Sequence, residues 1–228
     1  CGAGAGGTIL GRGAACRGRR GGREAEADGD PMWAGSRGSA ATNDGAGKVS
    51  FTAPGVPGQV SAISEAMRVA GAGAADMSFV EAHGTGTPLG DPVEVAALRQ
   101  AYRDWGGKAP DAPVLRGSVK GNNGHLDSAA SMSGFIKSVL GVAHGVMPGT
   151  ANFARLHPNL GPHIDPFYVS ASPQPLPDEP SKRVGGINAC GFGGTNIHRV
   201  IQGYESPSRP RTSGSSGMLD RRLILPLS

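Results

Sequence analysis

Apolar residues recur at helical spacing between Pro57 and Gly71, and the glycine favours a helix end there. The positions are Val60, Ile63, Met67 and Ala70. A short apolar run over residues 78–82 predicts a strand, and the spacing over residues 93–102 predicts a second helix. The first half of the chain therefore alternates helix, strand and helix.

The second half continues this alternation. Residues 114–120 predict a strand, and residues 128–144 predict a helix that Gly145 ends. Small residues fill the first half of this helix, which predicts a buried central helix because small side chains let neighbouring backbone pack closely. Residues 182–190 and 195–201 predict two strands joined as a hairpin by a glycine-rich loop. This order indicates a layered α/β domain with a mixed sheet.

The two ends of the chain are harder to interpret. Residues 2–10 have the composition of a small-residue strand, whereas residues 11–22 show no period. Residues 33–39 predict a strand, and a short strand is expected at 167–170. After Gly203 the chain is rich in Ser, Pro, Arg and Gly, which is typical of a linker.

The composition favours a folded middle with loose ends. Of 228 residues, 39 are glycine and 18 are proline, but the hydrophobic 38% gather in compact runs. No apolar run reaches the roughly 18 residues needed to cross a membrane, and no charged-then-apolar leader opens the chain. Cys1, Cys16 and Cys190 show no paired spacing, so we expect a reduced, cytoplasmic chain without a membrane partner.

The net charge of +4 is concentrated near the two ends. Five arginines crowd residues 12–23, and four lie within residues 209–222. A basic arm can bind nucleic acid, but no aromatic residues alternate with these arginines to stack on bases, and no nucleic-acid motif accompanies them. We therefore favour solvated basic segments and expect no nucleic-acid partner.

The stretch Val80–Glu94 carries the most informative polar residues. His83 follows the apolar run directly, within Val-Glu-Ala-His-Gly-Thr-Gly-Thr-Pro-Leu-Gly-Asp-Pro-Val-Glu. Asp91 can cap the next helix, and Glu94 stands three residues later, as a capping box requires. Ligands of α/β sheets gather at such strand ends, so His83 is a candidate site residue. A turn histidine with only local hydrogen bonds is the alternative.

Glycine-rich polar clusters follow three separate strands: His83, then Lys120 with His125, then the loop 191–196. Two neutral imidazoles in one pocket can donate hydrogen bonds to a carbonyl oxygen on which negative charge develops. Lys120 can orient His125 or bias its proton, and backbone N–H groups of the glycine loop can hold a second oxyanion. A structural role explains each histidine alone, but the shared pattern of three clusters favours a site.

The sequence lacks the motifs of several other kinds of active site. A zinc site requires His or Cys at close spacing, and His83 and His125 have no third ligand nearby in sequence. Gly84-Thr-Gly-Thr lacks the Gly-Lys-Ser/Thr end of a phosphate loop, no GxGxxG follows a predicted strand, and no GxSxG elbow is present. We therefore expect no metal site, no dinucleotide cofactor and no serine-hydrolase chemistry.

Three long motifs, in the same order along the chain, resemble the β-ketoacyl synthase family, and most closely the ketosynthase domains of modular polyketide synthases. They are Val80–Pro92, Gly117–Ala130 with Lys-Gly-Asn-Asn-Gly-His, and Gly186–His198 with Asn-Ala-Cys-Gly-Phe-Gly-Gly-Thr-Asn. The resemblance covers residues 27–202, the C-terminal region of such a domain. It leaves residues 1–26 as a poorly matching Gly/Arg-rich segment and residues 203–228 as the linker that follows the domain.

The resemblance implies an α/β, thiolase-like layered αβαβα fold, of which this chain supplies mainly the C-terminal half. It implies decarboxylative Claisen condensation, a reaction of polyketide and fatty acid biosynthesis. In that reaction an acyl chain on a cysteine accepts a carbanion derived from malonyl on an acyl carrier protein. His83 and His125 would assist decarboxylation and stabilise the enolate, and Lys120 would support His125. The residues implied to bind substrate are Thr85, Thr87, Asn123, Gly191, Phe192, Gly193 and Gly194.

The chain departs from the family in several places. The family's nucleophilic cysteine lies in a Thr-Ala-Cys-Ser-Ser motif that is missing from these 228 residues, and none of the three cysteines has a comparable setting. Gly121-Asn-Asn stands where Ser-Asn-Ile is usual, and Ala189 replaces a usual Ser. The arginine-rich stretch 11–23 fits the family poorly, which indicates either an altered reading frame or a divergent loop.

We therefore interpret the chain as part of a polyketide β-ketoacyl synthase, an acyltransferase that is inactive in the absence of its nucleophilic cysteine. The alternative is a non-catalytic remnant that docks a carrier protein or a neighbouring domain. Expected partners are an acyl carrier protein, an N-terminal ketosynthase half or neighbouring polyketide synthase domains, and a second copy in the complete, homodimeric enzyme. We expect no cofactor beyond the phosphopantetheine that carries the substrates. Because half of a shared core would expose an apolar face, self-association is also expected.

Overall fold

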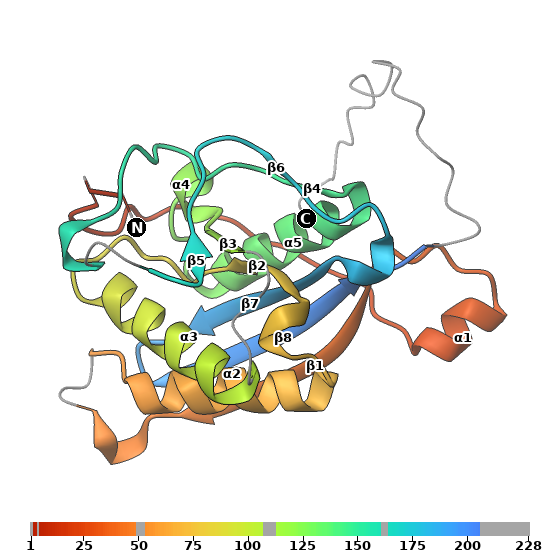
Figure 1. Ribbon diagram of the computed structural model, residues 1–228, viewed down its shortest axis with the longest axis horizontal. Coiled ribbons are helices and arrows are strands. Elements are labelled where there is room, and N and C mark those ends of the chain that lie inside the picture. Colours follow the sequence, from red (N-terminus) through yellow and green to blue (C-terminus); the bar gives the residue numbers. More distant parts are fainter. Residues whose placement is uncertain (1, 4, 49–52, 107–112, 161–163, 206–228) are drawn as a thin grey trace, which may run out of the picture.

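A mixed six-stranded sheet forms the centre of the computed structural model, which describes residues 2–3, 5–48, 53–106, 113–160 and 164–205 (Figure 1). The sheet order is β1-β8-β7-β2-β3-β5. Strands β1, β8 and β7 pair antiparallel, and β7, β2, β3 and β5 pair parallel, so the mixed sheet is confirmed. The strands are β1 (Ala34–Asn43), β2 (Met77–Glu81), β3 (Val114–Gly117), β5 (Phe167–Tyr168), β7 (Val184–Cys190) and β8 (Thr195–Gly203).

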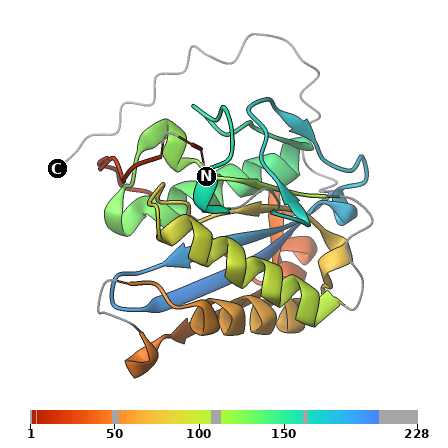
Figure 2. The same ribbon diagram turned by 60° about the vertical axis from the view of Figure 1, so that its left-hand side comes forward.

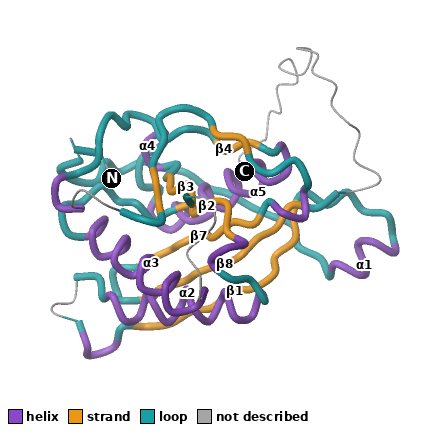
Figure 3. The backbone as a smooth tube through the Cα atoms, in the orientation of Figure 1, coloured by secondary structure: helices purple, strands orange, loops and turns teal. Residues whose placement is uncertain are grey.

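Helices cover both faces of this sheet (Figure 2). Helices α2 (Val56–Ala70) and α3 (Gly90–Gly106) pack on one face, and α5 (Ala130–His144) packs on the other. The tube drawing shows the strands as a continuous layer between them (Figure 3). The shorter elements are α1 (Gly22–Ala27), α4 (Lys120–Asn123), the pair β4 (Val146–Met147) and β6 (Gln174–Pro175), and 3₁₀ turns at Gly45–Gly47, Ala74–Asp76, Asp127–Ala129, Pro158–Leu160 and Pro180–Lys182.

The sheet divides the apolar core into two parts because neighbouring side chains of a strand point to opposite faces. Val114 and Val200 pack toward α2 and α3, in the larger cluster. Their chain neighbours Leu115 and Ile201 pack toward α5, in the smaller one. Both faces of the sheet are thus covered by helices, which explains why the predicted strands are continuous apolar runs.

The helix predictions are confirmed at their ends. Helix α2 ends at Gly71 with φ of +60°, and α5 ends at Gly145 with φ of +75°, the left-handed conformation that glycine adopts most easily. Within α5 the small residues face the sheet, but Ile136 and Leu140 on the other side are 37% and 43% exposed. The prediction of a buried central helix is therefore right for one face only.

Other local predictions were wrong. The strand expected over residues 114–120 ends at Gly117, and Lys120 begins the short helix α4. Residues 2–10 form no strand in their described part and contribute only single bridges, at Gly2 and Leu10. Helix α1 lies in a segment without hydrophobic periodicity. The loop and linker predictions fall largely on residues 107–112 and 206–228, outside the described residues.

No described helix combines the length and the apolar character that a membrane span requires.

Candidate active site

A cavity of about 760 Å³ lies where the segments after β2, β7 and α4 meet. The three strand-end clusters predicted from the sequence therefore converge in space. Six of the predicted residues line this cavity: His83, His125, Thr85, Thr87, Gly191 and Phe192. The N-terminal residues Thr8 and Leu10 also line it, although nothing in their sequence indicated a role in a site.

The two candidate histidines lie side by side in the wall of this cavity, in an edge-to-face contact of their rings. The ring centroids of His83 and His125 lie 5.4 Å apart, with the ring planes at 84°. Each histidine follows a different strand of the sheet, so only the parallel pairing of β2 with β3 brings them together. One small group, such as a thioester carbonyl, can therefore contact both rings.

His125 is held in one tautomer by its own loop. Its Nδ1 accepts a hydrogen bond of 3.1 Å from the backbone N–H of Asp127, so the proton of the neutral ring is on Nε2. Burial and the charge of Lys120 lower the pKa of His125, against a smaller opposing effect of Asp127. The N-terminal segment fixes the His125 backbone, since His125 N–H donates to Ile9 and Gly11 N–H donates to His125, at 2.7 and 2.9 Å.

His83 is more deeply buried than His125. Burial, followed by the charges of Lys120 and His125, lowers the pKa of His83 to about 3. Its Nδ1 is buried and has no hydrogen-bond partner among the described residues. His83 is therefore a neutral imidazole at pH 7.

Glu94 does not form the predicted capping box. Its carboxylate accepts the backbone N–H groups of His83 and Gly84, at 2.7 and 3.1 Å, instead of capping α3. The helix begins at Gly90, three residues before the predicted start at Val93, and the N–H of Gly90 donates to Thr87 Oγ1. The local spacing matched a capping box, but buried donors from other strands outcompete the helix end for this carboxylate.

Two further buried donors complete the surroundings of Glu94. Arg116 on β3 and Asn188 on β7 each donate to it at 2.8 Å. The Asn188 Oδ1 in turn pairs with His198 Nδ1 at 2.5 Å. Because Nδ2 of Asn188 is committed to Glu94, His198 Nδ1 must be the donor. The sequence analysis missed Arg116, Asn188 and His198; charged and polar residues within predicted buried strands were the available signal.

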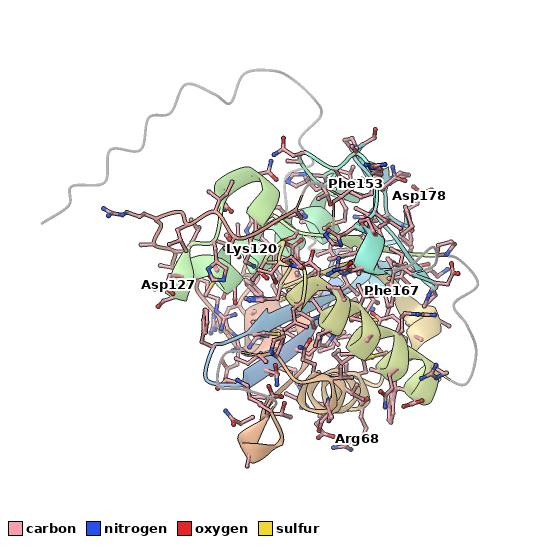
Figure 4. The ribbon with its side chains drawn as sticks, turned by 90° about the vertical axis from the view of Figure 1, so that its left-hand side faces the viewer. Arg68, Lys120, Asp127, Phe153, Phe167 and Asp178 are labelled. Atoms are coloured by element: carbon pink, nitrogen blue, oxygen red, sulfur yellow. The ribbon has the colours of Figure 1, made fainter. Side chains whose placement is uncertain are left out.

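Lys120 does not line the cavity but acts on it through its charge, which lowers the pKa of both His83 and His125. Burial lowers the pKa of Lys120 itself, and the nearby carboxylates of Glu94 and Glu81 oppose that shift. Glu81 also fixes the start of α4, because it accepts Val119 N–H and Lys137 Nζ, both at 2.7 Å. Figure 4 shows Lys120 on the same side of the molecule as Asp127.

Three predicted substrate-binding residues lie outside the cavity lining. Asn123 is exposed, and its amide group donates to the carbonyl of Val119 at 3.1 Å. Gly193 is exposed, and its carbonyl accepts from Asn43. Gly194 is buried in the hairpin turn with φ of +88°. Asn123 is thus turned to its own loop, and the two glycines shape the turn that carries Phe192.

The glycine loop offers fewer free donors than the sequence indicated. The N–H of Gly191 donates to Thr195, and that of Gly194 donates to Gly191, at 2.8 and 2.9 Å, within the hairpin. Among the described residues, the N–H groups of Phe192 and Gly193 have no such partner. The Phe192 ring is 77% exposed at the cavity edge. Only the tip of the loop can therefore receive an oxyanion.

Cys190 lies in the cavity wall near these groups. Burial, followed by the negative charges of Glu94 and Asp44, raises the pKa of its thiol. A thiol with a raised pKa is a poor nucleophile because the reactive thiolate is scarce. The geometry therefore supports the interpretation that Cys190 does not carry an acyl group.

Residues 33–154 match the family Ketoacyl-synt_C, described as the beta-ketoacyl synthase, C-terminal domain. The chain belongs to this family. The matched range holds His83, Lys120 and His125, whereas the loop 191–194 lies beyond it. The resemblance of the sequence to the β-ketoacyl synthase family is thereby confirmed.

The relatives of this ketosynthase chain are polyketide synthases. It is 38% identical over 85% of its length to the mycocerosic acid synthase-like polyketide synthase of Mycobacterium tuberculosis, and covers 9% of that protein. It is 35% identical over 90% of its length to the polyketide synthase PksN of Bacillus subtilis, and covers 4% of it. The chain therefore spans less than a tenth of the length of these two relatives.

Solved ketosynthases have the same fold. Ketosynthase twelve from the bacillaene polyketide synthase of Bacillus amyloliquefaciens superposes with a TM-score of 0.76 at 38% identity, over 80% of this chain and 32% of that one. The ketosynthase from module 1 of the bacillaene synthase gives 0.75 at 36% identity, over 84% and 34%. The chain thus has the fold of the C-terminal part of a thiolase-like ketosynthase domain, as predicted.

Proposed function

We propose that this chain supplies the two-histidine part of a ketosynthase active site that condenses an acyl thioester with a malonyl-type extender on an acyl carrier protein. The observation that carries the proposal is the pair of neutral imidazoles, His83 and His125, with ring centroids 5.4 Å apart on one cavity. Neutral rings donate N–H hydrogen bonds without requiring a counterion, which suits an oxygen that becomes negative only during the reaction.

In the proposed reaction the malonyl thioester loses its carboxylate as CO₂, and the electron pair of the broken C–C bond moves into the thioester as an enolate. The Nε2–H of His125 is available to donate to the enolate oxygen, because Nδ1 already accepts from Asp127. The positive charge of Lys120 nearby favours this anion further. The enolate carbon then attacks the carbonyl of an acyl thioester on a cysteine that another part of the enzyme supplies, and the new C–C bond forms as the cysteine leaves as a thiolate.

The buried carboxylates position these groups. Glu94 fixes the backbone of His83 and Gly84, and Glu81 fixes the start of the helix that carries Lys120. A displacement of about 1 Å at a reacting group can lower a rate by about a hundredfold, so both carboxylates are expected to affect turnover. Proposed partners are the carrier protein, neighbouring polyketide synthase domains and a second copy of the enzyme.

The test combines this chain with the cysteine-bearing N-terminal part of a ketosynthase and measures carrier-bound β-ketoacyl product together with CO₂ release. We expect His125→Ala and His83→Ala each to lower both by about 10²–10³-fold, the usual effect of removing one oxyanion donor. The matched control is His144→Ala, which alters an exposed histidine at the far end of α5. Product formation unchanged in His125→Ala would reject the proposed role.

A non-catalytic docking module is the second candidate, and it is favoured by Cys190 in the cavity wall, where burial raises the pKa of its thiol. In that case the chain binds carrier protein without any contribution from the histidine pair. Carrier-protein binding by this chain alone, unchanged in the His83→Ala/His125→Ala double variant and without activity after complementation, would support this second function.

A further inference from the structure

His198 lies at the far end of a series of buried hydrogen bonds that reaches His83. The backbone N–H of His83 donates to Oε1 of Glu94 at 2.7 Å, and the same oxygen accepts from Nδ2 of Asn188 at 2.8 Å. Oδ1 of Asn188 accepts in turn from Nδ1 of His198 at 2.5 Å. Asn188 and His198 lie directly opposite each other on β7 and β8, and neither belongs to the cavity lining. A residue outside the cavity is thus connected to a histidine in its wall.

Glu94 accepts from four N–H groups, two on each carboxylate oxygen. Gly84 and Arg116 donate to Oε2, in addition to the two donors on Oε1. A carboxylate whose four lone-pair positions all face N–H donors is ionised, and it cannot shift toward one donor without losing another. Burial raises the pKa of Glu94, and the hydrogen bond from Asn188 is the largest effect that opposes this rise. Asn188 therefore contributes both to the position and to the charge of the group that holds His83.

His198 selects the orientation of the Asn188 amide that Glu94 requires. Nε2 of His198 is buried without a hydrogen-bond partner among the described residues, so the single proton of the neutral ring is on Nδ1, which donates to Asn188. A half-turn of the amide would set its oxygen against the Glu94 carboxylate, with no proton between the two acceptors. The ring is itself held in place, because a Cβ added to Gly186 would lie only 2.7 and 2.8 Å from two of its atoms. Loss of the Nδ1–H would therefore release the amide and weaken its contact with Glu94.

We propose that His198 is a positioning residue of the candidate active site. It holds the Asn188 amide in the orientation that fixes Glu94, and Glu94 in turn fixes the backbone of His83. All three side chains of this series are buried, so each hydrogen bond depends on a protein partner. The effect on turnover rests on the proposed function, whereas the effect on the His83 backbone does not.

Hydrogen exchange of backbone amides in the 228-residue chain tests the connection without any assay of catalysis. The measured quantity is the exchange rate of the His83 and Gly84 amides, both of which donate to Glu94, divided by that of the Ala82 amide. Ala82 is the internal reference because its N–H donates to the carbonyl of Gly117 at 2.8 Å and makes no contact with the carboxylate. A general loss of stability raises all three rates, so the ratio isolates the contact with Glu94.

Four variants separate positioning from stability. His198→Leu retains side-chain volume but removes the donor, and it should raise the exchange ratio at least about tenfold, the effect of losing a hydrogen bond to a charged group. Asn188→Ala breaks the series one residue nearer to Glu94 and should raise the ratio similarly. His198→Asn places an amide N–H where the ring has Nδ1, so it should keep the ratio near that of the unmodified chain, although the smaller side chain lowers stability. Val200→Ala is the matched control, since Val200 is a buried residue two positions further on the same face of β8.

An unchanged ratio in His198→Leu or Asn188→Ala, or an equal rise in Val200→Ala, would overturn the proposal, because exchange would then follow stability alone. In the complemented enzyme, His198→Leu should lower kcat about tenfold with little change in KM, since His198 does not line the cavity, and His198→Asn should restore most of kcat. An unchanged kcat in His198→Leu, in an enzyme that His83→Ala inactivates, would overturn the role in the active site. A raised exchange ratio with condensation that is insensitive to His83→Ala would instead contradict the proposed function and leave the positioning of His83 intact.

Discussion

The backbone N–H of His83 donates to the carboxylate of Glu94 at 2.7 Å. The same carboxylate accepts from Arg116 at 2.8 Å, with side chains only 4% and 2% exposed. A cavity histidine is thus attached to a buried ion pair that spans β3 and α3. Such a pair contributes little net free energy compared with apolar residues, but removing the charge of one member is destabilising because the other member stays charged and buried.

Glu94→Gln is therefore expected to lower the free energy of unfolding by about 3–5 kcal/mol, because the buried Arg116 keeps its charge and loses the negative charge of the Glu94 carboxylate. Urea denaturation measures the change. Glu65→Gln is the control and should change stability little, since Glu65 pairs with Arg68 in solvent and an exposed ion pair is screened by water. A double variant, Glu94→Gln/Arg116→Met, should recover part of the unfolding free energy that Glu94→Gln loses. If the changes in unfolding free energy of the two single variants simply add up in the double variant, the two side chains do not interact.

Gly38→Ala tests the close packing of β1 on α2. An added Cβ would lie 2.7 Å from the backbone nitrogen of Ala70 and still closer to the carbonyl oxygen of Ala66. Because backbone of α2 cannot move aside easily, we expect a loss of at least about 1–3 kcal/mol in unfolding free energy. Gly35→Ala on the same strand should be tolerated, since its nearest neighbour is 4.0 Å away. Equal stability of the two variants would show that β1 and α2 are not in this contact.

The burial of His198 is expected to make the folded chain less stable in acid. Burial lowers its pKa from the usual 6.5 to about 3, so between these values the unfolded chain binds a proton that the folded chain does not. Stability is complete above pH 6.5 and falls as pH decreases toward 3, by about 1.4 kcal/mol per pH unit for one such histidine. Urea midpoints from pH 7 to pH 4 should show a smaller slope in His198→Gln, where His83 still contributes, and an unchanged slope in His144→Gln. The same slope in all three proteins would refute this assignment.

Cys190 should react slowly with thiol reagents at neutral pH. Burial raises the pKa of its thiol, so little thiolate is present, whereas Cys16 is exposed. Peptide mapping after brief treatment with iodoacetamide should find Cys16 modified long before Cys190. In denaturant the two rates should converge. Rapid modification of folded Cys190 would instead indicate an activated thiol in the cavity and reopen its role as a nucleophile.

The outer face of α5 should promote self-association. Ile136 and Leu140 lie one helical turn apart and are exposed, and Trp33 beside His144 adds an exposed indole. Replacing Ile136 and Leu140 by lysine should shift sedimentation from oligomers toward monomer without loss of stability, because neither side chain is buried. Val69→Lys, an exposed apolar position on α2, is the control and should change little. Monomeric behaviour of the unmodified chain would contradict the expectation.

Local sequence patterns determined much of this fold. The helix that ends at Gly71, the helix that ends at Gly145 and the hairpin around Gly191 follow from spacing and from glycine conformations, which act over a few residues. The sequence also marked His83, Lys120 and His125 as site residues, because each follows a strand that ends in glycine-rich polar chain. Parallel strands then carry these ends to the same edge of the sheet.

Only the tertiary structure decided which groups those residues contact. Glu94 matched a capping box by spacing, yet it binds His83, Arg116 and Asn188, because buried donors from other strands require an acceptor more than an exposed helix end does. Asn123 lay in the right motif but turns to its own loop. The pairing of Ile9 with His125 joins segments that no local pattern relates. Hydrogen-bond partners and burial depend on residues far apart in the chain, whereas the periodicity of apolar residues reflects only residues that are close in sequence.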